Sequence, residues 1–378
     1  MIKLMRRVKT QPRPNWQATV ESQGFHFHTV DERPYWDESV HYEFSAAEID
    51  VIEKATYELD KMCVEAVQQV IDQNLFDRFQ IPPEFVQWVI RSWDRDEQTV
   101  VGRFDLCFSG RGEPKLLEYN ADTPTSLLEA AVIQWQWMKD TQPSRDQFNS
   151  IHERLIEAWG AVKPTTHGTM HFTCIGGNLE DFMTVSYLRD TAMQAGLDTQ
   201  YIDMEKVGWN FDRRLFVDER ENPITHCFKL YPWEWMVRER FAPMLQADTT
   251  RWLEAPWKMI LSNKAILPTL YQLFPDSPYL LPAGFNPPGG DYVRKPILGR
   301  EGANVEVMVG GRKIVSTEGE YGEPYVYQRY FPLPNFEGNY PVIGSWMVNG
   351  YACGIGIRED VSPVTQNTSR FVPHVFVG

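Results

Sequence analysis

Helical periodicity dominates the first part of the chain. Over residues 45–74 apolar positions recur every three or four residues, and Ser45 with Glu48 forms a capping-box pattern where this run begins. We therefore predict a long amphipathic helix there. The same spacing predicts shorter helices over about 83–93, 126–140 and 144–163. Residues 1–44 are rich in Pro, His and aromatic residues without a clear period, so they are expected to form an ordered but irregular N-terminal arm.

Strand patterns follow in two forms. An apolar run over 170–175 ends at two glycines, a helical stretch covers about 179–195, and a second strand pattern covers 199–204. This order predicts a βαβ unit with a parallel sheet. The runs 215–217 and 225–230 flank a polar turn and are predicted to pair as a hairpin. From residue 291 onward, short apolar runs alternate with Gly and Pro turns, which is typical of an antiparallel sheet.

A second hairpin is predicted where 100–108 and 115–120 alternate with period two around a turn rich in Gly. If Phe108 pairs with Lys115, one face of the ribbon is apolar and belongs to the core. Its expected pairs are Phe104 with Tyr119 and Leu106 with Leu117. The other face pairs Asp105 with Glu118 and Arg103 with Asn120. Two carboxylates then lie about 5 Å apart at Cβ and repel each other.

Two interpretations account for this polar face. A hard divalent cation can lie between Asp105 and Glu118 with the Asn120 carbonyl as a third oxygen ligand, a set that suits Mg²⁺ bridging to a nucleotide phosphate. Alternatively, the face is solvated and Arg103 is its counter-ion, as on many hairpins. The hydroxyl-rich run 121–126 leads into a predicted helix, and a helix N-terminus can bind an anion. Its ordinary alternative is an N-cap by Thr125 or Ser126.

Basic and glycine residues form a second cluster over 292–305. A predicted strand delivers Lys295, and Gly299 and Gly302 can let the next loop fold its N–H groups over phosphates, although both can equally be turn glycines. The run is neither a Walker A motif nor a dinucleotide fingerprint. Upstream, Lys264 lies at a predicted helix start, where a cation opposes the helix dipole unless it points to solvent or an anion holds it.

Two further strands carry candidate residues. The aromatic run 325–331 has a backbone edge of the kind that reads adenine, or it is a core strand. Arg358 follows glycines on a late strand, where it suits an acyl phosphate or a γ-phosphate, or forms an ion pair with Glu359 or Asp360.

Composition narrows the class of protein. The chain has 378 residues, 43% of them hydrophobic and 13% aromatic, which excludes a disordered, collagen-like or coiled-coil chain. The net charge of −14 disfavours binding to nucleic acid and to anionic membrane surfaces, and slightly favours an amine substrate. No apolar run is long enough to span a membrane, and residues 1–15 lack the pattern of a signal peptide.

Cysteine and histidine chemistry is disfavoured. The five cysteines lie far apart, without a Cys-x-x-Cys pair or an activating context, so neither a disulfide framework, a structural zinc site nor thiol catalysis is expected. We expect a soluble, cytoplasmic protein. The histidines include the pairs His26 with His28 and His167 with His171, but the second pair lies at a predicted loop-to-strand junction rather than on a helix, so a zinc site is disfavoured. No Gly-x-Ser-x-Gly elbow is present.

Taken together, five segments resemble the synthetase domain of the glutathionylspermidine synthases in order and spacing. They are 102–105, 117–122, 263–268, 295–300 and 357–358. The resemblance runs from about residue 15 to the end. It implies an ATP-grasp fold of the mixed α+β or α/β class, in which two β-rich lobes clasp ATP beside a Rossmann-like βαβ lobe. The implied organisation is an arm over 1–44, helices and the Mg²⁺-binding hairpin over 45–140, a substrate lobe over 141–245 and a nucleotide-binding lobe over 246–378.

Residue by residue, the resemblance assigns roles to the polar positions. Asp105, Glu118 and Asn120 would bind Mg²⁺, Arg103 would contact ATP and the acid substrate, and Arg358 would stabilise the transition state. The implied ATP site comprises Arg103, Phe104, Asp105, Lys264, Lys295, Glu301, Gly302, Gln328, Arg329, Tyr330 and Phe331. The implied substrate residues are Thr123, Thr125, Glu180 and Asp181.

The reaction implied is acid–amine ligation: ATP phosphorylates a carboxylate, and an amine then displaces the phosphate to form an amide. The loop 299–304 is expected to close over the site and exclude water. The bifunctional enzymes of the family carry an upstream Cys/His amidase domain, which we expect to be absent here. Glutathione with spermidine, or another acid with another polyamine, are the expected substrate pairs. An ATP-binding module without turnover and a kinase-like phosphotransferase stay as alternatives.

Overall fold

The alternating residues around 100–120 form an antiparallel hairpin in the computed structural model, which describes residues 5–377. Its strands are β5 (Val101–Cys107) and β6 (Lys115–Asn120). β5 also pairs with β18 from the far end of the chain, which completes a five-stranded antiparallel sheet in the order β20-β19-β18-β5-β6. The added strands are β18 (Tyr340–Val348), β19 (Tyr351–Asp360) and β20 (Arg370–Val372). We call this the central sheet.

The register of the hairpin matches the prediction over its inner half. Arg103 pairs with Asn120, Phe104 with Tyr119 and Asp105 with Glu118. The rings of Phe104 and Tyr119 stack with centroids 3.8 Å apart, on the core side. The predicted pairs Leu106–Leu117 and Phe108–Lys115 are wrong: an irregularity after Asp105 shifts the register, so that Leu106 pairs with Leu116 and Cys107 with Lys115.

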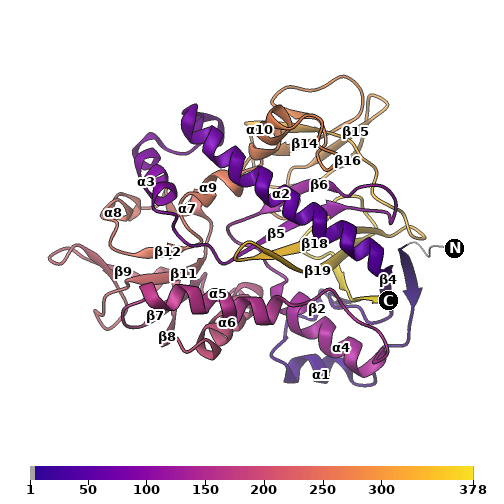
Figure 1. Cartoon of the computed structure of the whole chain (residues 1–378), viewed down its shortest axis with the longest axis horizontal. Coiled ribbons are helices and arrows are strands. Elements are labelled where there is room, and N and C mark those ends of the chain that lie inside the picture. Colours follow the sequence, from indigo (N-terminus) through magenta and orange to yellow (C-terminus); the bar gives the residue numbers. More distant parts are fainter. Residues whose placement is uncertain (1–4, 378) are drawn as a thin grey trace.

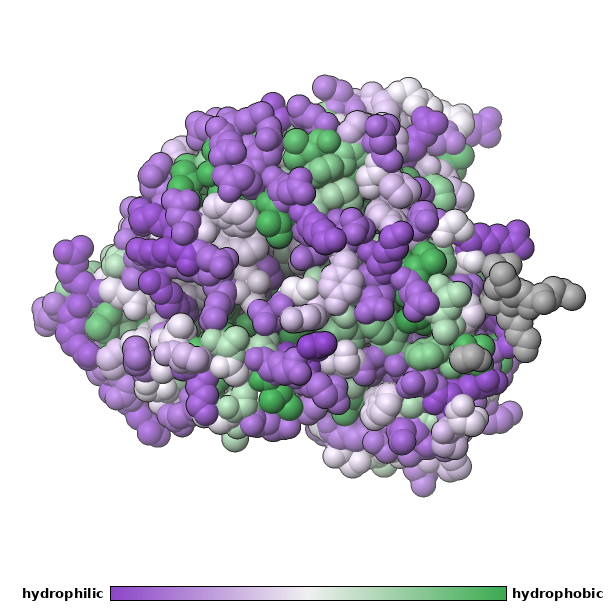
Figure 2. Space-filling view, viewed as in Figure 1, coloured by the Kyte–Doolittle hydropathy of each residue, from purple (hydrophilic) through white to green (hydrophobic). Residues whose placement is uncertain are grey.

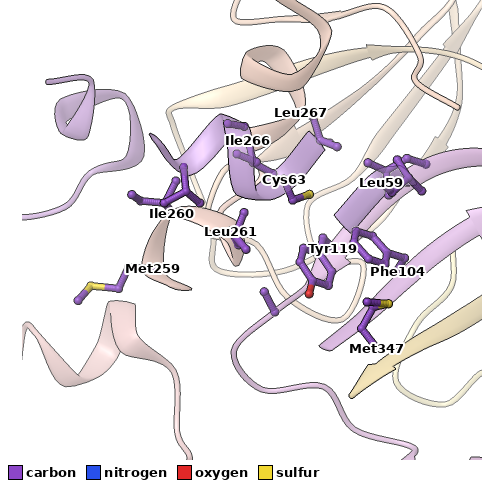
Figure 3. Packing of buried hydrophobic residues seen from close by; sticks show 14 of the residues in the cluster. Leu59, Cys63, Phe104, Tyr119, Met259, Ile260, Leu261, Ile266, Leu267 and Met347 are labelled. Carbon is purple, nitrogen blue, oxygen red and sulfur yellow. The ribbon is translucent and has the colours of Figure 1, made fainter. Parts of the chain in front are cut away.

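The long predicted helix is α2 (Ala46–Asp72), which lies across the central sheet (Figure 1). Its capping box is present, because Glu48 N donates to Ser45 Oγ and Ser45 N donates to Glu48 Oε2. Figure 3 shows Leu59 and Cys63 of this helix beside Phe104, Tyr119 and Met347 of the sheet. This packing buries the apolar face of the hairpin, whereas the polar face lies outside this core.

The predicted βαβ unit is confirmed as part of a four-stranded parallel sheet, ordered β12-β11-β7-β8. Its strands are β7 (Met170–Cys174), β8 (Thr199–Asp203), β11 (His226–Leu230) and β12 (Arg251–Leu253). The crossover helix is α6 (Leu179–Gln194), and α5 (Ile151–Val162) packs beside it. Figure 1 shows this sheet and its helices as a layer below the central sheet.

The hairpin predicted from 215–217 and 225–230 is wrong. β10 (Leu215–Val217) pairs instead with β9 (Gly208–Asn210), while β11 lies in the parallel sheet between β7 and β12. The physical reason is burial: β11 is buried along its whole length, and a strand covered on both faces belongs inside a parallel sheet.

A third sheet, antiparallel and ordered β13-β17-β14-β15-β16, lies on the other side of the hairpin (Figure 1). Its strands are β13 (Ala283–Gly284), β14 (Tyr292–Pro296), β15 (Glu306–Val309), β16 (Arg312–Ser316) and β17 (Tyr325–Arg329). The short helices α9 (Lys258–Leu261) and α10 (Ile266–Leu273) precede it. The antiparallel pattern predicted from residue 291 is confirmed for this sheet.

The N-terminal segment is more regular than predicted. β1 (Arg6–Lys9) and β4 (Val40–Ser45) form a sheet with β21 (His374–Val377), which is parallel to β4, and α1 (Trp16–Ser22) lies between them in sequence. β2 (Thr29–Val30) and β3 (Arg33–Pro34) form a small ribbon. The segment pairs with the chain's C-terminal strand, a long-range contact that local periodicity cannot reveal. Residues 1–4 of the predicted arm lie outside the described residues.

The remaining helices are short. They are α3 (Pro83–Asp94), α4 (Gln134–Thr141), α7 (Trp233–Met236) and α8 (Ala242–Leu245), with 3₁₀ turns at Phe76–Phe79, Lys163–Thr165 and Met204–Lys206. The helix predicted over 126–140 has a π-helical turn, Glu129–Ile133, before α4, and that over 144–163 begins only at Ile151. Within residues 5–377 no helix is long and apolar enough to cross a membrane. Hydrophilic residues cover most of the face in Figure 2.

Candidate active site

The polar face of the hairpin opens into a cleft with two adjoining parts. Both parts are lined by Asp105, Glu118, Lys264, Gly299 and Gly302, so they are continuous. One part is mainly apolar and lies against the third sheet; its apolar walls include Leu281, Val293, Val305, Val307, Leu333 and Val342. The other part is polar and reaches the parallel sheet; its walls include Arg103, Asn120, Thr123, Thr125, Glu180, Asp181, Arg300, Glu301 and Arg358. The cleft therefore has an apolar end and a strongly charged end.

Carboxylates and cations alternate where the two parts meet. Arg103 Nε lies 2.7 Å from Asp105 Oδ1, and Asn120 Nδ2 donates to Asp105 Oδ2 at 3.0 Å. Lys264 Nζ lies 3.1 Å from Glu118 Oε2. The side chain of Asp105 is only 14% exposed and that of Glu118 28%, so this face is not freely solvated. The repulsion between the two carboxylates is offset by these cations.

The same face offers ligands for a hard metal ion. Asp105 and Glu118 offer carboxylate oxygens. Asn120 now directs its Nδ2 toward Asp105, and a 180° rotation of its amide would present the carbonyl oxygen instead, so all three ligands would be oxygens. Residues 5–377 contain no group of three or more His, Cys, Asp or Glu side chains arranged to hold a metal. Two carboxylates and one amide leave coordination positions for water and phosphate, as Mg²⁺ requires. The donor set therefore fits Mg²⁺ bound together with an anion.

Two lysines approach Glu118 from different elements. Lys264, just before α10, donates to the Gly299 carbonyl at 2.6 Å as well as contacting Glu118. Lys295 of β14 is buried and donates to the Leu117 carbonyl and to Gln328 Oε1, each at 2.9 Å. Burial lowers the pKa of Lys295 to about 8, with Glu118 acting against this and Lys264 adding to it. Burial tends to raise the pKa of Glu118, but Lys264 and Lys295 outweigh it and hold that pKa below its usual value.

Gln328, Arg329, Tyr330 and Phe331 all line the apolar end, as their predicted role requires. Gln328 is buried, and its Nε2 donates to the Leu116 carbonyl at 2.9 Å, which ties β17 to the hairpin. Phe104 is different from the other predicted nucleotide residues. Its side chain is completely buried in the core on the opposite face of β5, and it lines neither part of the cleft.

The loop after Lys295 lies between the two parts of the cleft. Glu301 and Gly302 both have positive φ, 53° and 69°. A Cβ atom at Gly302 would overlap the Thr365 carbonyl oxygen, so only glycine fits this close approach of two backbone segments. Glu301 lines the polar part, and burial raises its pKa, with Glu180 adding to this effect.

Arg300 is a site residue that the sequence reasoning did not single out. Its guanidinium donates to Thr123 Oγ1 and lies 3.2 Å from Glu234 Oε1 at the start of α7. It therefore joins the loop 299–304 to the hydroxyl-rich run 121–126 and to α7. Its position in the sequence could have identified it, because Arg300 directly follows Gly299 in the basic and glycine-containing cluster 292–305.

Arg358 has no carboxylate partner among the ion pairs of the described residues. Its guanidinium donates to the carbonyls of Gln366, Asn367 and Ser369 at 2.8–2.9 Å and to Ser126 Oγ at 3.1 Å. The alternative of an ion pair with Glu359 is wrong, because Glu359 pairs with Arg7 and Arg370. A cation held by neutral groups in a cleft is suited to bind an anion.

The predicted substrate residues gather in the polar part. Thr125 accepts a hydrogen bond from Arg103 Nη1 at its carbonyl, and Thr123 contacts Arg300. Glu180 is 7% exposed, and its Oε1 has no hydrogen-bond partner. Burial raises the pKa of the neighbouring Asp181 to about 7, with Glu180 adding to it. This wall can accept a cationic ligand, which would satisfy the unpaired carboxylate oxygen.

Known proteins with similar sequences agree on one family. The glutathionylspermidine synthase preATP-grasp family model matches residues 7–377. A Haemophilus influenzae protein named "Putative acid--amine ligase" is 41% identical over 99% of this chain and all of its own length. Trypanothione synthetase from Crithidia fasciculata is 31% identical over 82% of this chain. The bifunctional glutathionylspermidine synthetase/amidase from Escherichia coli is 27% identical over 95% of this chain.

This chain spans only part of the length of two of these relatives. The chain spans 52% of the trypanothione synthetase and 60% of the bifunctional enzyme. Among solved structures, a glutathione synthetase-like effector from Globodera pallida covers 98% of this chain with a TM-score of 0.56 at 10% identity. That likeness confirms a mixed α/β fold shared with a glutathione synthetase-like protein. By the family model and by the relatives, the chain belongs to the glutathionylspermidine synthase preATP-grasp family.

Proposed function

We propose that the chain is an ATP- and Mg²⁺-dependent ligase with an ATP-grasp architecture, which joins a carboxylic acid to an amine. The observation that carries this proposal is the cleft itself: an apolar end continues into a charged end through paired carboxylates flanked by lysines. The names of three relatives, each a synthetase or an acid–amine ligase, support carbon–nitrogen bond formation.

ATP would bind along the cleft with its base at the apolar end. Gln328, Arg329, Tyr330 and Phe331 would surround the adenine, between the residues of the third sheet and those of the hairpin. Lys264 and Lys295 would neutralise the phosphates, and the loop around Gly302 would cover them. In this division, residues 246–378 carry most of the nucleotide site, 45–140 carry the metal hairpin, and 141–245 form the substrate side next to the arm over 1–44.

Asp105, Glu118 and Asn120 would hold Mg²⁺ against the phosphates. The ion would supply charge stabilisation for phosphoryl transfer when bound. On binding, the Lys264 ammonium would exchange its contact with Glu118 for one with a phosphate oxygen. The three residues thus change from an internally paired cluster to a ligand set.

The chemistry would proceed in two displacements at the charged end. A carboxylate oxygen of the acid substrate attacks the γ-phosphorus, and the bond to ADP breaks. The amine nitrogen then attacks the acyl carbon, inorganic phosphate leaves with its bonding electrons, and the nitrogen loses a proton. Arg103 and Arg358 would stabilise the negative charge that develops in these steps, because both line this part of the cleft.

The acid and the amine would approach from the substrate side. Thr123, Thr125 and Arg300 would contact the acid, since they offer hydroxyls and a cation. Glu180, Asp181 and Glu301 would bind the amine as a cation. The names of the relatives point to glutathione-derived acids and polyamines, so a thiol peptide such as glutathione and a polyamine such as spermidine are the first substrates to test.

The testing experiment is ADP release with Mg²⁺-ATP across a matrix of acids and amines. The acids are glutathione, short peptides and amino acids; the amines are spermidine, putrescine and related compounds. ADP that requires one acid and one amine together, and an amide of the corresponding mass, would establish the ligase. Asp105→Ala and Arg358→Ala should abolish this signal. Phosphate transfer to a single substrate would indicate a kinase instead, and ATP binding without turnover would indicate a non-ligating module.

A further inference from the structure

A chain of hydrogen bonds runs from Arg358 into the interior, away from the cleft. Arg358 Nη1 lies 3.1 Å from Ser126 Oγ, which lies 2.9 Å from the hydroxyl of Tyr35. The Tyr35 hydroxyl donates to Glu129 Oε1, also at 2.9 Å. Tyr35 is 1% exposed and Glu129 3% exposed, so the inner end of this series of hydrogen bonds is shielded from solvent.

All hydrogen bonds in this series are donated in the same direction, from Arg358 toward Glu129. A guanidinium can only donate, so Ser126 Oγ accepts from Arg358. An ionised carboxylate can only accept, so with Glu129 ionised the Tyr35 hydroxyl donates to it, and the Ser126 hydroxyl must donate to Tyr35. Hydrogen bonds aligned in this way strengthen one another in a low-dielectric interior. The negative charge of Glu129 is thereby linked to the positive charge of Arg358 without direct contact.

The backbone conformation of Ser126 supports a role for its hydroxyl in this series of hydrogen bonds. Its φ is 66°, a left-handed conformation that is unfavourable for a residue with a side chain. The alternative of an N-cap by its side chain is wrong for Ser126, because its hydroxyl contacts Tyr35 and Arg358 and makes no capping hydrogen bond. The backbone is therefore held in a costly conformation that directs this hydroxyl toward Arg358.

The guanidinium of Arg358 is almost fully engaged by these partners. Its contacts to Ser126, Gln366, Asn367 and Ser369 use four of the five N–H donors of an arginine. The donor left over belongs to Nη1, on the nitrogen that Ser126 holds. The Tyr35 ring also packs against the guanidinium, whose Cζ lies 5.1 Å from the ring centroid. Ser126 and Tyr35 thus determine where the free donor points in the cleft.

The N-terminal segment that carries Tyr35 is anchored on the strands around Arg358. Phe371 N donates to the Tyr35 carbonyl at 2.6 Å, and Asp37 N donates to the Phe371 carbonyl at 3.0 Å, so this segment pairs with β20. Arg370 of β20 contacts Asp37 at 2.9 Å. Glu359, next to Arg358, is bound by Arg7 from β1. The N-terminal segment therefore contacts β20, a strand next to that of Arg358, and Glu359, the residue that follows Arg358 in β19.

We propose that Tyr35, together with Ser126 and Glu129, positions the Arg358 guanidinium for the transferred phosphoryl group. This inference rests on the proposed function, because it takes Arg358 as the residue that stabilises the transition state. It gives the N-terminal segment a part in the reaction: Tyr35 never touches substrate, yet its hydroxyl sets the geometry of a group that does.

The test removes only one oxygen atom, in Tyr35→Phe, and assays ligation at pH 8 with the acid and amine that the substrate matrix identifies. We expect kcat to fall about ten- to a hundredfold, because a small misplacement of a catalytic group costs rate, while KM for ATP changes less than about threefold. Tyr187→Phe is the matched control, since Tyr187 is also buried and its hydroxyl binds His152, away from the cleft. The control should retain wild-type kcat.

A double-mutant cycle separates positioning from a general loss of stability. Ser126→Ala should reduce kcat like Tyr35→Phe, and the double variant should lose no more than the larger single loss, because the two residues act through one chain. Equal kcat in Tyr35→Phe and Tyr187→Phe, or fully additive losses with Ser126→Ala, would overturn the proposal.

A second readout does not depend on turnover. The Nε–Hε NMR signal of Arg358, identified by its loss in Arg358→Lys, should broaden or shift in Tyr35→Phe and stay unchanged in Tyr187→Phe. If no acid–amine pair gives turnover, the proposed function fails, and this signal still decides whether Tyr35 positions Arg358. An unchanged signal in Tyr35→Phe would refute the positioning role even in an active ligase.

Discussion

Lys264 Nζ lies 3.1 Å from Glu118 Oε2, although the two residues come from different layers of the fold. Glu118 belongs to the central sheet, and Lys264 lies between α9 and α10. The contact lies where the apolar and charged parts of the cleft meet. In the proposed ligase, phosphate oxygens would compete for the Lys264 ammonium and Mg²⁺ for the Glu118 carboxylate, so the first prediction concerns this contact.

Replacing Glu118 by Gln should remove metal-dependent turnover. The substitution keeps the size of the side chain but removes its charge, so Lys264 loses its partner and Mg²⁺ a ligand. We expect ADP release to fall by about 10²–10³-fold, the scale of losing one preorganised electrostatic contact. Titrations with Mg²⁺ at saturating ATP measure this. Glu113→Gln, in the exposed turn of the same hairpin, should leave the rate unchanged; a comparable loss there would contradict the assignment.

Gly344→Ala should disturb Arg103 without touching the cleft directly. Gly344 of β18 pairs with Asp105 of the adjacent strand β5, and a Cβ atom at position 344 would lie 2.7 Å from Arg103 Cδ. Arg103 would have to move, so we expect kcat to fall about tenfold or more. Gly160→Ala is the control, because nothing lies within 4 Å of a Cβ at that helical position. It should stabilise the fold by about 0.5–1 kcal/mol with unchanged kcat, measured by urea unfolding and ADP release.

Binding of a polyamine should strengthen as the pH rises through 7. Burial, reinforced by Glu180, raises the pKa of Asp181 to about 7, and only the ionised carboxylate attracts a cation. Calorimetry with spermidine and a non-hydrolysable ATP analogue should show affinity increasing from pH 5.5 to 7 and levelling near pH 8. Asp181→Asn should flatten this dependence. Asp190→Asn, exposed on the same helix, should retain it; a flat wild-type profile would exclude Asp181 from the amine site.

The buried carboxyl of Glu129 should make stability depend on pH. Burial is the main cause that raises its pKa from 4.5 to about 7; Glu180 adds to this, while Tyr35 and Arg358 oppose it. The folded state therefore holds the proton more tightly than the unfolded chain, so this contribution is complete below pH 4.5 and is lost as the pH rises through 7. It amounts to about 3 kcal/mol.

Glu129→Gln cannot titrate and should escape this loss. Relative to wild type, the unfolding free energy of Glu129→Gln should therefore rise by about 3 kcal/mol between pH 4.5 and pH 8. Urea unfolding at the two pH values gives this difference. A constant difference between the proteins would show that Glu129 titrates alike in the folded and unfolded states.

Much of the β5–β6 hairpin could be predicted, because the pattern that specifies it is local in the sequence. Period-two alternation assigns Phe104 and Tyr119 to the core and Asp105 and Glu118 to the opposite face, and the structure agrees. The same reasoning placed Leu106 opposite Leu117, which is wrong, because alternation cannot reveal an extra residue in one strand. It also missed Arg300, whose partners Thr123 and Glu234 lie far away in sequence.

Outside the N-terminal segment, local sequence thus specified the position of most helices and strands. It also specified the apolar face of the long helix and of the β5–β6 hairpin, and the polar residues that lie together on that hairpin. Tertiary structure decided the partners: β5 with β18, β11 inside a parallel sheet, and Tyr35 behind Arg358. The physical reason is that hydrophobic periodicity marks a surface to be buried but not what buries it. Contacts between distant segments form only when the whole chain closes around them, so only the folded structure could place the N-terminal segment behind the charged end of the cleft.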